Sequence, residues 1–293
     1  MALNLHRKSS EKDEVLIYDT SSAVTAKFVS QADARVIIAE DLASISRNAD
    51  VIITCLPNPA IVQKVYGTLL ANQKEPRPDR LVIDCSTIDP LTSLKVAYDI
   101  EKAEFGNLVD APMSGGVVGA TAGCLSFMVG GSEETFGRAQ QVLEKMGSKI
   151  VHCGPNGTGI SAKLANNYIL AINNLATAEA MNFGVKAGLD PSVLARIINS
   201  ATGRNWASEV NNPVPGVIKT APASRQYQGG FATALMNKDL GLAITAAEQA
   251  NAPLFLSNSA SNIYGKLTSD DRYAKLDFSA VYKYMQENQK AKL

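Results

Sequence analysis

The segment LVIDCSTIDPLTSLKVAYDIEKAE, which runs from Leu81 to Glu104, predicts a strand followed by a helix. Its first six residues, LVIDCS, are mostly apolar, as in a strand that is covered on both faces. Asp89 and Pro90 then mark a helix start, because aspartate caps the free N–H groups of the first turn and proline fits its first position. The segment is therefore typical of one unit of a layered α/β fold.

The same alternation of short strands and helices continues to about residue 155. Alternation of this kind predicts a parallel, doubly wound sheet with helices on both faces. The expected strands are Val15–Asp19, Val36–Ala39, Val51–Pro57, Leu81–Ser86, Leu108–Ala111, Leu125–Gly130 and Ile150–Gly154.

Beyond Gly154 the pattern is helical only. One helix is expected from Gly159 to about Ala187, which is too long for a crossover between neighbouring strands, and Asp190-Pro191 begins the next. We therefore predict an α/β domain over residues 1–155 and an all-α domain over residues 156–293, joined by the long helix. Further helices are expected at Thr233–Ala250, at Leu254–Lys266 and from Ser279 onward.

The composition is that of an ordinary globular protein, with 46% apolar and 19% charged residues among 293. Basic and acidic residues both number 28, so no basic surplus points to nucleic acid or to an anionic membrane. No apolar run reaches the roughly 18 residues of a membrane span. Isolated cysteines and only two histidines argue against a Cys/His zinc site, so no metal is predicted.

The stretch Gly157–Ala162 fits the glycine pattern G-x-G-x-x-A of dinucleotide-binding loops. That pattern belongs to a strand–helix–strand unit with an acidic residue at the end of its second strand. Glu179, the acid at the right distance, lies inside an uninterrupted helical segment instead. We therefore interpret the glycines as a helix start that lets another part of the backbone approach closely.

Lys163 and Asn167 follow in the same helix, four residues apart and thus on one face. We expect Lys163 in the first turn, where the positive end of the helix dipole would lower the pKa of its amine. Such an amine suits proton exchange near neutral pH. A solvated surface lysine is the alternative interpretation.

The segment Asp110–Gly116, DAPMSGG, ends another expected strand with a serine and two glycines. Backbone N–H groups that no side chain covers form a nest for an anion, so together with the Ser114 hydroxyl they fit a carboxylate. A plain turn is the alternative. TCLPNP and DCSTIDP also end strands, and a doubly wound sheet binds its ligand at this carboxyl edge.

DAPMSGG, GTGISAKLANN and YQGGFATALMNKDLGLA occur in this order, and with them the chain resembles the β-hydroxyacid dehydrogenases from Met1 to the last helix. NPVPGV is similar to the branch that acts on 3-hydroxyisobutyrate. The resemblance implies a Rossmann-type domain, a small hydroxyacid substrate and a mitochondrial location. It also implies NAD-dependent oxidation of (S)-3-hydroxyisobutyrate to methylmalonate semialdehyde in valine breakdown. The long helix shared with an all-α domain favours a homo-oligomer.

The resemblance also assigns functional residues to matching positions of this chain. Lys163 would take the hydroxyl proton while a hydride passes to the nicotinamide, and Asn167 would orient the substrate or the lysine. Asp19 would receive the adenosine ribose, and because no arginine follows it in DTSSAV we expect NAD rather than NADP. Ser114, Gly115 and Gly116 would hold the substrate carboxylate, Phe231 and Asp239 would complete the substrate site, and Leu56, Pro57, Thr87 and Lys238 would contact the cofactor.

The beginning of the chain departs from the family pattern. In relatives a segment MAxNL follows the first strand and the glycine loop GxGxMGxx, whereas this chain begins at that segment, Met1–Leu5. We therefore expect the first strand and the pyrophosphate loop to be missing, with Asp19 closing the second strand. A start assigned too late and a true loss both explain this, and a targeting segment would be missing for the same reason.

Two other functions remain open from the sequence. A chain without the glycine loop could be non-catalytic, unable to bind NAD, and associated with full-length subunits. The catalytic alternative is a related reductase of tartronate semialdehyde, glyoxylate or succinic semialdehyde. A 6-phosphogluconate dehydrogenase fits less well, because the sequence offers no evident basic cluster for a phosphate.

Overall fold

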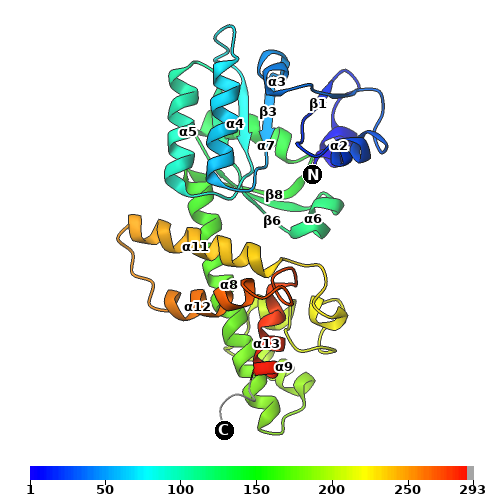
Figure 1. Ribbon diagram of the computed structural model, residues 1–293, viewed down its shortest axis with the longest axis vertical. Helices are drawn as coiled ribbons and strands as arrows, with labels where there is room; N and C mark the ends of the chain where they lie inside the picture. Colours follow the sequence, from blue (N-terminus) through cyan, green and yellow to red (C-terminus); the bar gives the residue numbers. More distant parts are fainter. Residues whose placement is uncertain (289–293) are drawn as a thin grey trace. The chain divides into compact units, whose positions relative to one another are not determined.

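The computed structural model describes residues 1–288, and the chain forms two compact units, Met1–Lys163 and Leu164–Leu293 (Figure 1). Residues 289–293, which end the predicted domain 156–293, lie outside the described part. The first unit is α/β and the second is helical. The domain boundary at residue 155 stays a prediction, and the two units divide inside the long helix α8 (Thr158–Lys186).

The first unit contains a two-stranded sheet and a six-stranded sheet. In the small sheet, β1 (Val15–Ile17) pairs in parallel with β2 (Val36–Ile38). The large sheet has the order β3-β4-β5-β7-β6, and β8 pairs with β7. Its strands are β3 (Val51–Thr54), β4 (Leu81–Asp84), β5 (Asn107–Asp110), β6 (Met113–Ser114), β7 (Leu125–Gly130) and β8 (Gly147–Gly154).

The large sheet is mixed, although its first three strands are parallel as expected. Thr54 pairs with Asp84 and Asp84 with Asp110, so the ends of β3, β4 and β5 are level. β7 runs antiparallel to β5 and β6, in contrast to the expected parallel sheet. Only the short helix α6 (Gly116–Ala122) connects β6 to β7, and a parallel return needs a crossover of about a dozen residues or more.

The small sheet is separate from the large one. Among the described residues, β1 pairs with β2 alone and β3 pairs with β4 alone. Ile38 and Val51 on these strands are 49% and 42% exposed.

Capping residues visible in the sequence begin two of the helices that cover the large sheet. Asp89 accepts the N–H of Thr92 over 2.8 Å at the start of α5 (Pro90–Lys102). Ser132 accepts the N–H of Thr135 over 3.1 Å at the start of α7 (Glu133–Leu143). The remaining helices of this unit are α1 (Ala2–Lys8), α2 (Ser22–Val29), α3 (Leu42–Asn48) and α4 (Pro59–Ala71).

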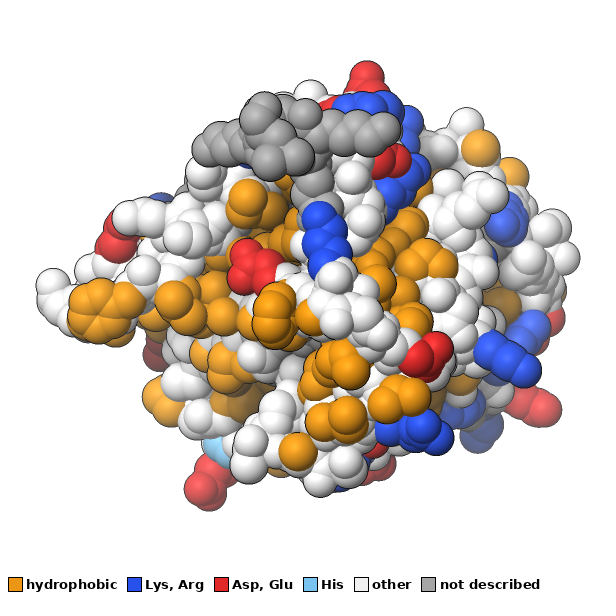
Figure 2. All heavy atoms as spheres, turned by 90° about the horizontal axis from the view of Figure 1, so that it is seen from below, with side chains coloured by type: hydrophobic (Ala, Val, Ile, Leu, Met, Phe, Trp, Pro, Cys, Tyr) orange, Lys and Arg blue, Asp and Glu red, His pale blue; other side chains and the backbone are white. Residues whose placement is uncertain are grey.

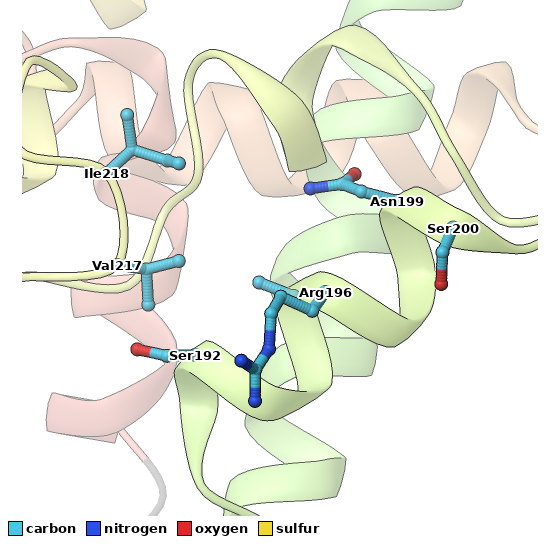
Figure 3. Close-up of a pocket in the computed structure, with 7 residues that line it drawn as sticks. Ser192, Arg196, Asn199, Ser200, Val217 and Ile218 are labelled. Carbon is cyan, nitrogen blue, oxygen red and sulfur yellow. The ribbon is translucent and has the colours of Figure 1, made fainter.

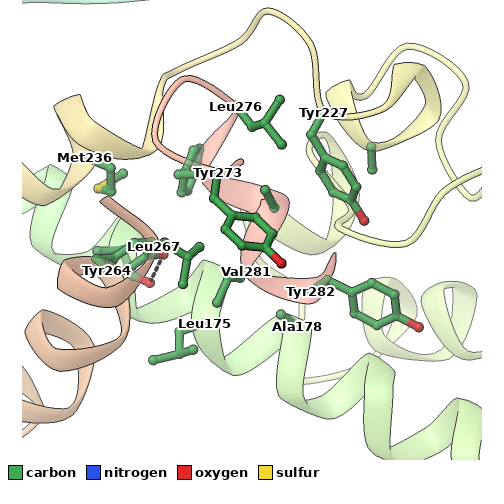
Figure 4. Packing of buried hydrophobic residues seen from close by; sticks show 14 of the residues in the cluster. Leu175, Ala178, Tyr227, Met236, Tyr264, Leu267, Tyr273, Leu276, Val281 and Tyr282 are labelled. Carbon is green, nitrogen blue, oxygen red and sulfur yellow. Dashed lines mark hydrogen bonds between the residues drawn. The ribbon is translucent and has the colours of Figure 1, made fainter. Parts of the chain in front are cut away.

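The second unit consists of helices around a core that is rich in tyrosine. Tyr264 and Tyr273 are fully buried, and Figure 4 shows them among Leu175, Met236 and Val281. Across residues 1–288, every helix is too short or too polar to span a lipid bilayer. The elements that follow α8 are α9 (Pro191–Ser200), α10 (Trp206–Glu209), η1 (Pro222–Arg225), α11 (Thr233–Gln249), α12 (Ser257–Thr268), η2 (Phe278–Ala280) and α13 (Val281–Asn288).

Candidate active site

Two loops of the first unit meet at the carboxyl edge of the large sheet. The loop after β3 contains Leu56 and Pro57, and the loop after β4 contains Ser86 and Thr87. The backbone N–H of Leu56 donates to the Ser86 hydroxyl over 2.9 Å. The structure thus brings these predicted cofactor positions together, at the edge where doubly wound sheets bind their ligands.

The buried carboxylate of Asp84, the last residue of β4, fixes Ser86 through hydrogen bonds. Asp84 accepts the backbone N–H of Ser86 over 3.0 Å, the Ser86 hydroxyl over 2.5 Å and the Thr54 hydroxyl over 2.8 Å. The Tyr66 hydroxyl lies 2.7 Å from that of Thr54. Burial raises the pKa of Asp84, although the bonds from Ser86 and Thr54 oppose the rise. Sequence reasoning missed this network. The signal for it was the aspartate inside the otherwise apolar run LVIDCS, Asp84.

Ser114, Gly115 and Gly116 form the turn between β6 and α6. Gly115 and Gly116 have φ angles of +130° and +60°, which residues with a Cβ rarely adopt. A Cβ on Gly115 would also lie 3.1 Å from the side chain of Leu125. The turn therefore requires its glycines, and its role as a carboxylate nest stays a prediction.

The carboxylate of Asp110 binds the start of α8. The N–H of Gly157 donates to Asp110 Oδ1 over 2.7 Å, and the N–H of Ile160 donates to Oδ2 over 2.9 Å. A Cβ on Gly159 would lie 2.4 Å from the carbonyl oxygen of Met128. This close approach confirms our interpretation of the glycine pattern, because a carboxylate of the protein itself occupies the helix start where a dinucleotide loop would bind phosphate. Sequence reasoning did not assign this function to Asp110.

Lys163 is the sixth residue of α8 and is buried, with 8% of its surface exposed. Because α8 begins at Thr158, Lys163 lies in the second turn, and its expected place in the first turn is wrong. The effect of the helix dipole weakens beyond the first turn. The alternative of a solvated surface lysine is also wrong.

The second unit brings three predicted residues together. The side-chain amide of Asn167 in α8 donates to Oδ2 of Asp239 over 2.7 Å, and the amine of Lys238 lies 3.2 Å from Oδ1. Asn167 and Asp239 are 1% and 3% exposed. Because a buried charge is costly unless polar groups replace its water, these contacts stabilise Asp239 inside the helical unit.

Phe231 precedes α11 on a loop that Asp277 organises. The N–H of Phe231 donates to Asp277 Oδ2 over 2.8 Å, and Asn211 donates its side-chain amide to Oδ1 over 3.0 Å. Gly230 has a φ of +74°, and a Cβ there would lie 2.1 Å from the same carboxylate. The close approach of Asp277 thus explains the second glycine of YQGGF, Gly230.

Asp19 lies two residues beyond β1 and is exposed. Its carboxylate accepts the N–H of Ser21 over 2.8 Å, which fixes the turn into α2. The expected strand Val15–Asp19 ends earlier, at Ile17, so Asp19 follows the strand instead of closing it. Its contact with a ribose stays a prediction.

An open hollow of about 690 Å³ in the second unit contains none of the predicted site residues (Figure 3). Ser192, Arg196 and Asn199 of α9 line it together with Val217 and Ile218. We do not assign it to the active site, because the predicted residues lie in the other clusters described above. Among residues 1–288, no group of three or more His, Cys, Asp or Glu side chains could hold a metal ion.

Comparisons with known proteins cover both units. Residues 1–154 match the family model of the NAD-binding domain of 6-phosphogluconate dehydrogenase. Residues 157–285 match the model described as NAD-binding of NADP-dependent 3-hydroxyisobutyrate dehydrogenase. A probable mitochondrial 3-hydroxyisobutyrate dehydrogenase of Dictyostelium discoideum is 49% identical over 86% of this chain and 78% of that protein. The mitochondrial enzyme of Mus musculus is 44% identical over 94% of this chain and 81% of that protein.

A solved structure also resembles this chain over nearly its whole length. The 3-hydroxyisobutyrate dehydrogenase of Mycobacterium tuberculosis, solved with L-serine, has a TM-score of 0.89 at 39% identity and covers 97% of this chain and 94% of that one. These matches confirm the resemblance, the Rossmann-type and helical domains, and the NAD cofactor. The chain therefore belongs to the 3-hydroxyisobutyrate dehydrogenases, a family of NAD-dependent oxidoreductases that act on hydroxyacids.

Proposed function

We propose that the chain oxidises (S)-3-hydroxyisobutyrate to methylmalonate semialdehyde in valine breakdown, with Lys163 as the general base. The proposal rests on the burial of Lys163 in a helix whose first turn is bound by Asp110 of the DAPMSGG segment. A lysine amine in its neutral form can accept a proton. The reaction requires such a group, because the hydroxyl proton must leave as the carbon gives up its hydride.

The substrate carboxylate is assigned to Ser114, Gly115 and Gly116. The glycines are exposed, and a serine hydroxyl and backbone N–H groups are the donors that a carboxylate accepts. In the second unit, Asn167 and Asp239 are assigned to the orientation of the substrate. Phe231, half-buried before α11, completes the substrate-binding set.

NAD, when bound, accepts the hydride at C4 of its nicotinamide. Asp19 is assigned to its adenosine ribose, because this exposed carboxylate has no basic residue among residues 20–26 and would repel the additional phosphate of NADP. Leu56, Pro57 and Thr87 are assigned to the cofactor at the sheet edge, where the Leu56 backbone is already fixed by Ser86.

Lys238 is assigned to the cofactor from the second unit, where its ion pair with Asp239 fixes the amine. The mitochondrial relatives support a mitochondrial location.

We also propose a homo-oligomer, because apolar side chains gather on the face that Figure 2 shows. In the second unit, the side chains of Phe183 and Phe255 are 75% and 91% exposed. A monomer in sedimentation velocity at micromolar concentration would contradict the oligomer.

The direct test of the proposed activity is Lys163→Ala. We expect it to abolish turnover of (S)-3-hydroxyisobutyrate while NAD binding, measured by calorimetry, is kept. Lys186→Ala is the matched control, because Lys186 is an exposed lysine of the same helix. If Lys163→Ala retains more than a tenth of wild-type turnover, the proton-transfer role is excluded.

The same assays distinguish the two alternatives. Faster reduction of tartronate semialdehyde, glyoxylate or succinic semialdehyde than oxidation of 3-hydroxyisobutyrate would identify a related reductase. A wild-type chain that folds and does not bind NAD would support the non-catalytic alternative.

A further inference from the structure

Asp110 is a fully buried acid at the end of β5, and both its oxygens are used by one other element. Oδ1 accepts the N–H of Gly157 and Oδ2 accepts the N–H of Ile160, which lie 47 and 50 residues further along the chain. These N–H groups belong to the start of α8, where no carbonyl of the helix itself can accept them. Asp110 therefore acts as a cap that a distant strand supplies.

The surrounding backbone encloses this carboxylate tightly. A Cβ on Gly130, the residue paired with Asp110 in β7, would lie 2.5 Å from Oδ1. A Cβ on Gly159, in the first turn of α8, would lie 2.8 Å from Oδ2. Both contacts require glycine, so the carboxylate fits between a strand and a helix start that cannot shift without breaking its bonds.

We propose that Asp110 is a positioning residue for Lys163, because its carboxylate fixes the first turn of α8 and so sets the place of the lysine one turn later. Ile160, which Asp110 binds, precedes Lys163 by three residues, so the bond and the amine are about one turn apart. This inference rests on the proposed function, in which Lys163 exchanges the proton.

The charge of Asp110 matters as well as its shape. An anion at a helix start offsets the positive end of the dipole, and an uncharged amide has a single acceptor oxygen for two N–H groups. The titratable groups that face Asp110 are Asp84 of β4 and Cys153 of β8, and Lys163 follows on α8. Burial raises the pKa of Asp110 to about 6, so the cap loses its charge in mildly acidic solution.

The experiment compares Asp110→Asn with Asp190→Asn. Asp190 is the matched control, because its carboxylate also accepts two backbone N–H groups, those of Ser192 and Val193, at the start of α9. We expect Asp110→Asn to lower kcat between about ten-fold and a hundred-fold through misplacement of the lysine. The KM values of Asp110→Asn for NAD and for the hydroxyacid should stay within about two-fold of the wild-type values. In the wild-type protein kcat should fall as the pH drops below about 6, and Asp110→Asn should lack this fall. Asp190→Asn should change none of these.

A folded Asp110→Asn variant with wild-type kcat and pH profile would overturn the inference, and so would a loss confined to KM. If the variant does not fold, amide hydrogen exchange of residues 155–165 in the wild-type protein decides. Gly157 and Ile160 should exchange slowly at pH 7, although no carbonyl of α8 can accept their N–H groups, because Asp110 accepts both. Unprotected exchange of these two N–H groups would overturn the inference. Turnover retained in Lys163→Ala would instead contradict the proposed function, so the two failures are distinguishable.

Discussion

The side-chain amide of Asn167 donates a hydrogen bond of 2.7 Å to the carboxylate of Asp239, although 72 residues separate the two in sequence. Both side chains are buried, and the second carboxylate oxygen of Asp239 lies 3.2 Å from the amine of Lys238. This contact ties α8 to α11 inside the second unit. It also supplies part of the polar surroundings that a buried carboxylate needs in place of water.

Asn167→Ala should therefore destabilise the protein, because it leaves one oxygen of Asp239 without this donor. A buried acceptor that loses its partner costs about 1–3 kcal/mol of unfolding free energy. Urea unfolding would measure the change. Asn173→Ala in the same helix is the control, and equal stability of the two variants would contradict the importance of the Asn167–Asp239 bond.

Ser114→Ala should raise the KM for the hydroxyacid about ten-fold or more, because a hydrogen bond to a charged group contributes about 1.5–3 kcal/mol. Turnover at saturation should change little. Steady-state kinetics with Ser148→Ala, an exposed serine of β8, provides the comparison. An unchanged KM would count against the carboxylate nest.

Ser86→Ala should raise the KM for NAD by several-fold, because Leu56 loses the hydroxyl that fixes its backbone, a hydrogen bond of about 1 kcal/mol. Ser93→Ala is a close control, since the Ser93 hydroxyl is equally buried and has no hydrogen-bond partner. Calorimetric titration with NAD would separate binding from catalysis. Equal affinity in both variants would show that the Asp84–Ser86 network does not position the cofactor loop.

Asp110 should make the stability of the protein depend on pH. Its pKa rises from 3.8 to about 6 on folding, so between about pH 4 and pH 6 the folded protein holds a proton that the unfolded chain has released. The proton on Asp110 stabilises the folded state, and this effect is complete below pH 4. The free energy of unfolding therefore falls as the pH rises from about 4 to about 6. About two pKa units correspond to about 3 kcal/mol.

Asp110→Asn removes this titration, so the decline between pH 4 and pH 6 should be smaller by that amount. Urea unfolding of wild type and variant at several pH values measures the difference between the two curves. Parallel curves would exclude a raised pKa for Asp110.

The strands and helices could be predicted because their signals are local. The apolar run LVIDCS and the Asp89-Pro90 pair fix β4 and α5 without reference to the rest of the chain. β6 is only two residues long, too short for a clear strand pattern. The antiparallel course of β7 depends on the pairing of Asp110 with Gly130, which no local sequence pattern predicts.

The site was predicted less completely, for a related reason. Asn167, Lys238 and Asp239 were found through the resemblance to a family, and the structure brings them together. Asp84 and Asp110 were missed as functional residues, because each lies in an apolar strand and becomes informative only once its hydrogen-bond partners are known. A carboxylate within an otherwise apolar strand is the signal to look for.

The bonds from Asp110 to the start of α8 also bear on the order in which the chain folds. A helix of 29 residues could begin at several places on its own propensity, yet its first turn is bound by a carboxylate almost 50 residues upstream. Contacts of such high sequence separation form late, since loop-closure entropy must be overcome first. The N-terminal turn of α8 is therefore expected to settle after β5 and β7 have paired, which couples the final placement of Lys163 to completion of the sheet.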